Sequence, residues 1–327
     1  MTRLRIRTPS RLHFGLLSWG PDAPRQYGGV GLLIDRPDLV VAAEPAAEWA
    51  ATGPLAERAR TVAVQVAERL ARTGLAVPAL RLEVEQAPPE HVGLGVGTQL
   101  SLAVARLVTT AAGLPAAPVA ELATLTGRGM RSGVGLHGFA RGGLIVDGGR
   151  RAPGSFPPLL VRLEFPADWR VLVVRPSGPR GLSGAAEADA FAALPPLPDA
   201  VSDRLCRLVL LGLLPAVVEH DLAAFGAALT AIQFHVGRAA APAQGGGLYA
   251  RPDLEPIVDF CRRNSLHGAG QSSWGPTLYA FSNAAPDRQA VLLADLRDRF
   301  GLGPEDAFWT QATHRGAHLL SASETRP

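Results

Sequence analysis

An α+β protein with two domains is the fold class that the sequence predicts. Strand-like and helical segments are mixed in the first half of the chain, helices dominate the second half, and a strand, a helix and a strand come last. A chain of 327 residues is also long enough to bury two ordinary hydrophobic cores. We place the boundary in the loop-rich stretch 166–200, and we predict one domain over residues 1–170 and another over 171–327.

Hydrophobic periodicity predicts the elements of the first domain. Apolar residues at Leu55, Val62, Val66 and Leu70 share one helical face, and Gly74 is a suitable stop for that helix. Further helices are predicted at 100–108 and 118–127. Alternating or short apolar runs predict strands at 4–7, 39–43, 80–85, 144–146, 160–165 and 171–175.

The second domain is expected to be mainly helical. We predict helices at 184–194, 203–214, 216–234, 254–264 and 286–300, and strands at 277–282 and 307–313. Pro215 is expected to separate two of these helices, because proline has no N–H and its ring clashes with the preceding turn. His235 is expected to end a helix, although it could also face a cleft.

Composition restricts the chemistry of any binding site. The chain contains no lysine, so all 32 basic residues are arginine, and a phosphate or carboxylate must be held by arginine or by backbone N–H groups. A Schiff-base lysine is excluded for the same reason. The net charge of +3 is mild and the charges are interspersed, so no nucleic-acid partner is expected.

Cysteine usage and hydropathy indicate the compartment. Cys206 and Cys261 lie far apart in apolar runs that read as helices, and we expect both to be buried thiols in a reducing environment. No apolar run reaches 18 residues and no signal-peptide pattern begins the chain. We therefore expect a soluble cytoplasmic protein with no membrane partner.

The stretch 91–107, H-V-G-L-G-V-G-T-Q-L-S-L-A-V-A-R-L, predicts an anion site. Glycine lets a backbone come close to a ligand, and the free N–H groups of a helix start favour an anion. The candidate phosphate-binding residues here are Gly93, Gly95, Gly97, Thr98 and Gln99. A glycine-rich turn that serves only packing is the alternative, and the string is neither a Walker loop nor a dinucleotide fingerprint.

Two further glycine-rich turns follow, at 127–138 (G-R-G-M-R-S-G-V-G-L-H-G) and at 268–276 (G-A-G-Q-S-S-W-G-P). Near the N-terminus, T-P-S-R-L-H-F-G places Arg11 and His13 on one strand face, because side chains alternate along a strand. The alternative to a ligand-binding role for His13 is a structural one, as a buried histidine that stabilises the strand.

These ordered motifs resemble the GHMP superfamily of galactokinase, homoserine kinase and mevalonate kinase over nearly the whole chain. The strings S-R-L-H-F-G, G-G-V-G-L-L-I-D, H-V-G-L-G-V-G-T-Q and G-Q-S-S-W-G-P-T are more closely similar to one branch, the β-ribofuranosylaminobenzene 5′-phosphate synthases. The resemblance implies a two-domain GHMP-kinase-like fold, with a ribosomal-protein-like N-terminal domain and a ferredoxin-like C-terminal domain. It also implies a homodimer.

Members of that branch condense phosphoribosyl pyrophosphate with 4-aminobenzoate or 4-hydroxybenzoate, and they release CO2 and pyrophosphate in methanopterin-type cofactor biosynthesis. The resemblance thus implies a decarboxylating phosphoribosyltransferase, and it leaves the choice of para-substituted benzoate open. Mg²⁺ is the expected cofactor, because charge on the departing pyrophosphate must be neutralised.

The chain departs from the kinases of this superfamily at the catalytic base. Kinases carry a pattern like S-G-x-D in the second glycine-rich turn, whereas the matching string here is S-G-V-G, with Gly135 in place of the aspartate. The first turn also has Thr98 where kinases carry a Ser-Ser pair. A positioned general base contributes on the order of 10²–10⁴-fold to a rate, so a kinase would need a replacement.

Loss of CO2 removes the need for a base at the ring carbon, which fits the synthase reading. Two alternatives stay open: an ATP-dependent small-molecule kinase of the same fold, and an inactive member that only binds a phosphorylated ligand. The synthase hypothesis assigns catalytic roles to Arg11, Arg131 and His137, with His137 as a hydrogen-bond donor to the benzoate carboxylate.

The remaining site residues are expected to bind substrate. Ser10, His13, Ser132 and Gly133 would contact the substrate in the N-terminal and second motifs. The third turn would hold phosphate through its amide and hydroxyl groups and stack an indole on the benzoate ring; its candidates are Gly268, Gly270, Gln271, Ser272, Ser273 and Trp274. Asp35 is the candidate Mg²⁺ ligand, although an aspartate before Arg-Pro also suits a turn.

Overall fold

The computed structural model describes residues 3–115, 117–129, 131–182 and 184–321, and it contains two β-sheets. The first sheet has the strand order β11-β1-β2-β4-β3, and β5 pairs with both β2 and β6. Its strands are β1 (Leu4–Ser18), β2 (Tyr27–Pro45), β3 (Ala50–Thr52), β4 (Leu80–Gln86), β5 (Leu144–Asp147), β6 (Leu159–Leu163) and β11 (His318–Leu319). The second sheet has the order β10-β7-β9-β8 and consists of β7 (Arg170–Val174), β8 (His267–Gln271), β9 (Leu278–Ser282) and β10 (Ala307–Gln311).

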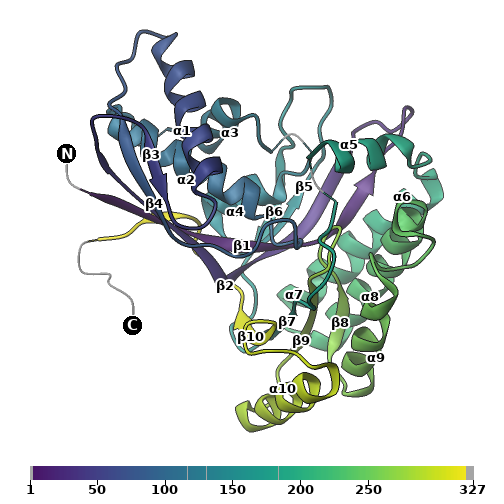
Figure 1. Cartoon of the computed structure of the whole chain (residues 1–327). Coiled ribbons are helices and arrows are strands. Elements are labelled where there is room, and N and C mark those ends of the chain that lie inside the picture. Colours follow the sequence, from purple (N-terminus) through teal and green to yellow (C-terminus); the bar gives the residue numbers. More distant parts are fainter. Residues whose placement is uncertain (1–2, 116, 130, 183, 322–327) are drawn as a thin grey trace.

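Helices cover one face of the first sheet and lie against both faces of the second (Figure 1). Four lie over the first sheet: α1 (Ala56–Ala71), α2 (Val96–Ala111), α3 (Val119–Thr126) and α4 (Val134–Arg141). The second half of the chain contains α5 (Gly184–Ala193), α6 (Asp199–Leu208), α7 (Leu214–Val218), α8 (Leu222–Ala240), α9 (Glu255–Arg263) and α10 (Pro286–Phe300). Short helical turns lie at η1 (Val209–Leu213), η2 (Ala241–Gln244) and η3 (Pro252–Leu254).

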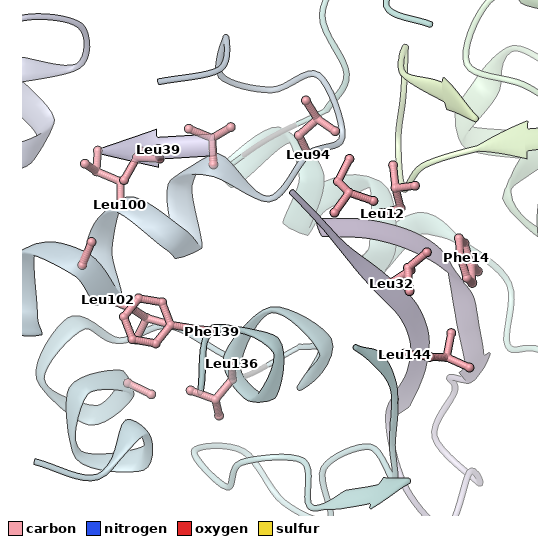
Figure 2. Packing of buried hydrophobic residues seen from close by; sticks show 14 of the residues in the cluster. Leu12, Phe14, Leu32, Leu39, Leu94, Leu100, Leu102, Leu136, Phe139 and Leu144 are labelled. Carbon is pink, nitrogen blue, oxygen red and sulfur yellow. The ribbon is translucent and has the colours of Figure 1, made fainter. Parts of the chain in front are cut away.

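One hydrophobic cluster runs through both halves of the molecule. It includes Leu12 and Leu100 of the first half as well as Phe225 and Phe281 of the second, all fully buried. Figure 2 shows part of this cluster, with Leu100 on α2 and Phe14 on β1. The Phe14 ring lies 5.0 Å from Tyr279 and 6.1 Å from Phe281, measured between ring centroids. Aromatic contacts of this kind add stability beyond the area that they bury.

The last strand returns to the first sheet. β11 pairs antiparallel with β1, and an isolated bridge joins Ile34 to Ala312. A second apolar cluster lies under α9 and α10, and it contains Val258, Leu296 and Leu172. The mixed order of strands and helices confirms the α+β fold class.

The expectation that Pro215 separates two helices was wrong. Helix α6, the π-helical turn η1 and α7 follow one another from 199 to 218 without a break, and Pro215 lies in the first turn of α7. A π-helical turn shifts the hydrogen-bond register just before the proline, so the missing N–H falls where it costs little. The break comes at 219–221, where Asp221 caps α8 by accepting a hydrogen bond from the N–H of Ala224.

Two other expectations also differ from the structure. Helix α8 continues to Ala240, so His235 lies inside the helix and does not end it. Cys261 is buried as expected, but Cys206 is exposed, because it lies on the outer face of the amphipathic helix α6. Across the described part of the chain, no helix is both long and apolar enough to span a membrane.

Candidate active site

A cavity of about 280 Å³ lies where β1, the second glycine-rich turn, α5 and α8 come together. Its polar lining includes Arg11, His13, Thr98, Arg128, Arg131, Ser132, Glu187 and Gln271. Its aromatic lining includes Phe14, Trp19, Phe191 and Trp274. A concave site with an aromatic wall and a few convergent polar groups is typical of a small-molecule site.

Arg11 is a cation in the wall of this cavity, and no described residue forms an ion pair with it. Its backbone N–H donates to the carbonyl of Leu94 at 3.0 Å, which attaches β1 to the first glycine-rich turn. Nε and Nη1 of its guanidinium are buried, and neither has a hydrogen-bond partner among the described residues. Burial lowers the pKa of Arg11 to about 10, although the carboxylates of Glu187 and Asp147 oppose that shift. A bound anion would satisfy these two N–H groups and offset the cost of burying the charge.

Gly135 lies directly beside this guanidinium. A Cβ atom built on Gly135 would lie 3.4 Å from Cγ2 of Thr98 and 4.0 Å from Nε of Arg11. Gly95 lies on another side, because its Cβ would be 3.1 Å from the same Nε atom. The position that holds an aspartate in the kinase pattern is therefore next to Arg11, and glycine leaves Arg11 without that carboxylate.

The N-terminus of α2 lies beside a cluster of arginines. Gly95 precedes the helix with a φ of 74°, a left-handed conformation that glycine adopts at little cost, and no side chain caps the first turn. A Cβ atom on Gly97 would lie 2.6 Å from Nη2 of Arg58, which forms an ion pair with Glu90. Arg128 lies in the cavity wall, and burial together with Arg58 and Arg131 lowers its pKa. Arginine charge and free N–H groups thus converge on one end of the cavity.

A hydrogen-bonded chain of three side chains begins in the cavity wall with His13 and Ser132 and ends behind it at Asp147. Nε2 of His13 lies 3.0 Å from Oγ of Ser132, which lies 3.3 Å from Oδ2 of Asp147. The same Asp147 oxygen accepts from the N–H groups of Gly133 and Val134 at the start of α4. Burial raises the pKa of Asp147, and these hydrogen bonds act in the opposite direction.

The hydrogen bonds define the tautomer of His13. Ser132 donates its single proton to the Asp147 carboxylate, and it also accepts from the Val134 N–H at 3.2 Å. On this basis we assign the donor role to Nε2 of His13, which leaves Nδ1 as the unprotonated nitrogen. Burial and the Arg11 charge lower the pKa of His13 well below its ordinary value, so the ring is neutral.

Helix α5 contributes the aromatic side of the cavity. Glu187 forms an ion pair with Arg131 at 2.9 Å, and the Arg131 guanidinium lies 5.6 Å from the ring centroid of Phe191. The Phe191 ring meets Trp274 edge-on at 5.2 Å. A flat aromatic substrate could stack in this part of the wall while its anionic group faces an arginine.

The third glycine-rich turn joins the two halves of the molecule. Oγ of Ser272 donates to the Gly93 carbonyl at 2.6 Å and accepts from the His13 N–H at 3.0 Å. The Gln271 side-chain amide is occupied by three partners within the protein, the Ala250 N–H, Oε1 of Gln244 and the Ser273 carbonyl. These contacts hold β8 and the following turn against the first glycine-rich turn.

Eight of the predicted site residues line the cavity: Arg11, His13, Thr98, Arg131, Ser132, Gln271, Ser273 and Trp274. The others have different surroundings. Gly93 packs on the Ser272 carbonyl, where an added Cβ would lie at 2.3 Å, and Gln99 donates to the Gly135 carbonyl at 3.0 Å. Ser10 is buried on β1 opposite Ile34.

Four more predicted residues lie outside the cavity lining. Gly268 and Gly270 lie in β8, where added Cβ atoms would meet Leu229 and Gln233 of α8 at 2.9 and 2.5 Å. Nε2 of His137 bonds to the Pro157 carbonyl at 2.8 Å. Asp35 forms an ion pair with Arg7 at 3.8 Å. Among the described residues, no group of three or more histidine, cysteine, aspartate or glutamate side chains is arranged to hold a metal ion.

Sequence reasoning missed several residues in or beside the cavity: Arg58, Arg128, Asp147, Glu187 and Phe191. In a chain without lysine, each arginine beside a glycine-rich turn is a candidate anion ligand, so Arg128 could have been found. Glu187 and Phe191 lie on α5, a helix with no strong amphipathic pattern, and their approach to the site depends on tertiary packing.

Comparisons with known proteins agree on one family. The GHMP kinases N terminal domain family matches residues 61–143. A β-ribofuranosylphenol 5′-phosphate synthase from Methanothermobacter thermautotrophicus is 33% identical, over 97% of this chain and 98% of the relative. One from Archaeoglobus fulgidus is 36% identical, over 97% of this chain and 99% of the relative.

Solved structures show the same fold at low sequence identity. A homoserine kinase from Cytophaga hutchinsonii superposes with a TM-score of 0.66 at 16% identity, and 98% of each chain is covered. A mevalonate diphosphate decarboxylase from Staphylococcus aureus superposes with a TM-score of 0.65 at 11% identity, with 98% of each chain covered. At these identities the likeness concerns the fold alone.

Proposed function

Because this chain belongs to the β-ribofuranosylphenol 5′-phosphate synthase family, we propose that it condenses phosphoribosyl pyrophosphate with 4-hydroxybenzoate and releases CO2 and pyrophosphate. The names of its relatives specify a phenol, which favours the hydroxyl over the amino compound as the ring substrate. The proposed product is a C-riboside 5′-phosphate for methanopterin-type cofactor biosynthesis. We also propose that the protein works as a homodimer, which light scattering in solution would test.

The unpaired Arg11 beside Gly135 is the observation that carries this proposal. A kinase-type aspartate at position 135 would neutralise Arg11 and occupy the place of an incoming anion. With glycine there, the buried guanidinium offers Nε and Nη1 to a carboxylate or a phosphate in the cavity. The site is therefore built to bind a negative charge where a kinase holds a proton acceptor.

The distribution of charge in the cavity supports one placement of the two substrates. The arginine-rich end at the start of α2 suits the pyrophosphate, which needs neutralised charge as it leaves. The aromatic wall formed by Phe191 and Trp274 suits the benzoate ring. The ribose carbon would pass through an oxocarbenium-like state between these two ends, and burial of the site would limit its capture by water.

No residue needs to remove a proton from the reacting ring carbon. The new C–C bond forms at the carbon that bears the carboxylate, and the electron pair of the broken C–CO2 bond restores the aromatic ring. CO2 takes the place of the proton that an ordinary ring substitution would release. The glycine at position 135 is consistent with this chemistry, because it can neither accept a proton nor bind a metal.

Mg²⁺ does not have a preformed ligand cluster in the described residues. Asp35 forms an ion pair with Arg7 and lies outside the cavity lining, whereas Glu187 lines the cavity. Mg²⁺ is often held by substrate phosphates with few protein ligands. We therefore propose that Mg²⁺ enters as part of the phosphoribosyl pyrophosphate complex.

A single incubation tests the proposed function. The purified protein is mixed with phosphoribosyl pyrophosphate, Mg²⁺ and carboxyl-labelled 4-hydroxybenzoate, and labelled CO2 and pyrophosphate are measured. We expect equal amounts of both products, and we expect Arg11→Met to lose most of the activity while Arg60→Met, on the exposed face of α1, retains it. Binding of phosphoribosyl pyrophosphate without CO2 from any para-substituted benzoate, or turnover of ATP with a small alcohol, would overturn the proposal.

A further inference from the structure

Nδ1 of His13 has no role in the anion binding proposed above. His13 lines the cavity, and its Nε2 is occupied by Ser132 at 3.0 Å. Within the described part of the chain, Nδ1 has no hydrogen-bond partner, and it is the unprotonated nitrogen of the ring. A neutral imidazole that lines a cavity, with one nitrogen held by a polar chain and the other without a partner, is suited to accept a proton.

Tight packing preserves this orientation. A Cβ atom on Gly29 would lie 2.8 Å from both Oγ of Ser132 and Oδ2 of Asp147, and 3.1 Å from Nε2 of His13. Glycine at position 29 therefore lets β2 pass directly beside the three linked side chains. The His13 N–H is also held by Ser272, so both the backbone and the ring of His13 are restrained.

We propose that Nδ1 of His13 accepts the phenolic proton of 4-hydroxybenzoate when the ring attacks the ribose carbon, and returns it when CO2 leaves. This proposal rests on the proposed function and adds the residue that handles the para substituent. His13 touches the substrate in this role, so it is a catalytic residue.

The two steps balance in atoms and electrons. In the first, the ring π electrons form the C–C bond, the C–O bond to pyrophosphate breaks with its electron pair on pyrophosphate, and the phenolic proton moves to Nδ1. The intermediate is a cyclohexadienone that still bears the carboxylate. In the second, the C–CO2 bond breaks, its electron pair restores the aromatic ring, the para oxygen takes back the proton, and His13 is neutral again.

The charges around His13 suit a weak base. Arg11 from β1 and burial lower its pKa, while Asp147 at the end of β5 lies behind Ser132, and Arg131 and Glu187 lie across the cavity as an ion pair. A weak base is sufficient, because the phenolic proton becomes strongly acidic once the ring has lost electron density. The resulting imidazolium is a good acid, so it returns the proton readily in the second step.

A histidine variant separates this role from a structural one. His13→Gln keeps a donor for Ser132 but has no basic nitrogen, and we expect kcat with 4-hydroxybenzoate to fall roughly 10²–10³-fold while KM changes less than about threefold. Phosphoribosyl pyrophosphate should bind with an unchanged Kd. In His13→Ala, added imidazoles should restore turnover, and the rescue should increase with the pKa of the imidazole. His235→Gln, a histidine of α8 outside the cavity lining, is the matched control and should behave like the unchanged protein.

A second measurement needs no variant of His13. The unchanged protein is given 4-methoxybenzoate, which has the same shape at the ring but no phenolic proton. We expect it to inhibit competitively and to turn over at least about 10²-fold more slowly than 4-hydroxybenzoate. Equal turnover of the two benzoates, or a His13→Gln enzyme with unchanged kcat, would overturn the role of His13 alone. Absence of CO2 release by the unchanged protein would overturn the proposed function as well.

Discussion

Nε of Arg11 lies 4.0 Å from the place where a Cβ atom on Gly135 would stand. The two residues come from different motifs, 124 positions apart in the chain as counted from 11 to 135. Their adjacency connects the missing kinase aspartate to the unpaired cation. It also means that the identity of the residue at position 135 should decide what Arg11 binds.

Replacing Gly135 by aspartate should therefore weaken benzoate binding. The new carboxylate would pair with Arg11 in a buried site, and an incoming anion would have to displace it. We expect KM for 4-hydroxybenzoate to rise at least about tenfold, which corresponds to about 1.4 kcal/mol of binding free energy. Steady-state kinetics of CO2 release measure this change.

The matched control is Gly135→Ala, which adds the Cβ atom without the charge. Its contact with Cγ2 of Thr98 at 3.4 Å is ordinary van der Waals packing, and alanine favours the helix α4 by up to about 1 kcal/mol. We expect this variant to remain active and slightly more stable. Equal losses in the alanine and aspartate variants would show that the added volume, not the charge, is responsible.

Arg58 should contribute to binding of phosphoribosyl pyrophosphate. It lies over Gly97 in the first turn of α2, and its ion pair with Glu90 holds it there. We expect Arg58→Met to weaken binding of the magnesium complex roughly tenfold in titration calorimetry, and to reduce the dependence of the affinity on salt. Arg60→Met, two positions away and paired with Glu57 on the exposed side of α1, is the control. An equal effect of both variants would mean that only the net charge matters.

Two glycines test the role of the third motif in packing. Gly268 and Gly301 have nearly the same φ, 59° and 61°, but an added Cβ meets Leu229 at 2.9 Å only at position 268, whereas position 301 is open. We expect Gly301→Ala to cost about 1 kcal/mol from backbone strain alone, and Gly268→Ala to cost 1–3 kcal/mol more, by analogy with overpacked cores. The midpoint of urea unfolding measures both.

Because Gly268 does not line the cavity, Gly268→Ala should leave the KM for both substrates within about twofold at a temperature where the variant is folded. A large rise in KM without loss of stability would mean that Gly268 does belong to the phosphate site, as its motif predicted.

The difference between predicted and observed features follows from the range of the interactions involved. Period two along β1 predicted that Arg11 and His13 share a face, and both line the cavity. The α2 helix follows the first glycine-rich turn as expected, because a helix start is a local feature. By contrast, the approach of α8 to β8, which requires glycine at 268 and 270, joins segments far apart in the chain and has no local signal.

The same reasoning explains why some of the predicted site residues lie outside the cavity lining. His137 and Asp35 have the chemistry of site residues, but the Pro157 carbonyl and the Arg7 side chain already occupy them. Asp147 closes a buried strand and was not recognised, because its partners Ser132 and Gly133 are supplied by a different turn. Residue type therefore predicted which side chains could act, whereas only the fold shows which of them are already occupied.

The stability of the protein should depend on pH through His13. Burial and Arg11 lower the pKa of the folded-state His13 well below 6.5, the value expected in the unfolded chain. Below that pH the unfolded chain binds a proton at His13 that the folded protein does not bind, so the free energy of unfolding falls as the pH falls. Between pH 7.5 and 5.5, this one group should lower the free energy of unfolding by about 1.4 kcal/mol.

Urea unfolding of the unchanged protein and of His13→Gln at both pH values isolates the effect, because the other histidines are shared. The unchanged protein should lose about 1.4 kcal/mol more than the variant; identical losses would mean that the folded protein does not lower the pKa of His13.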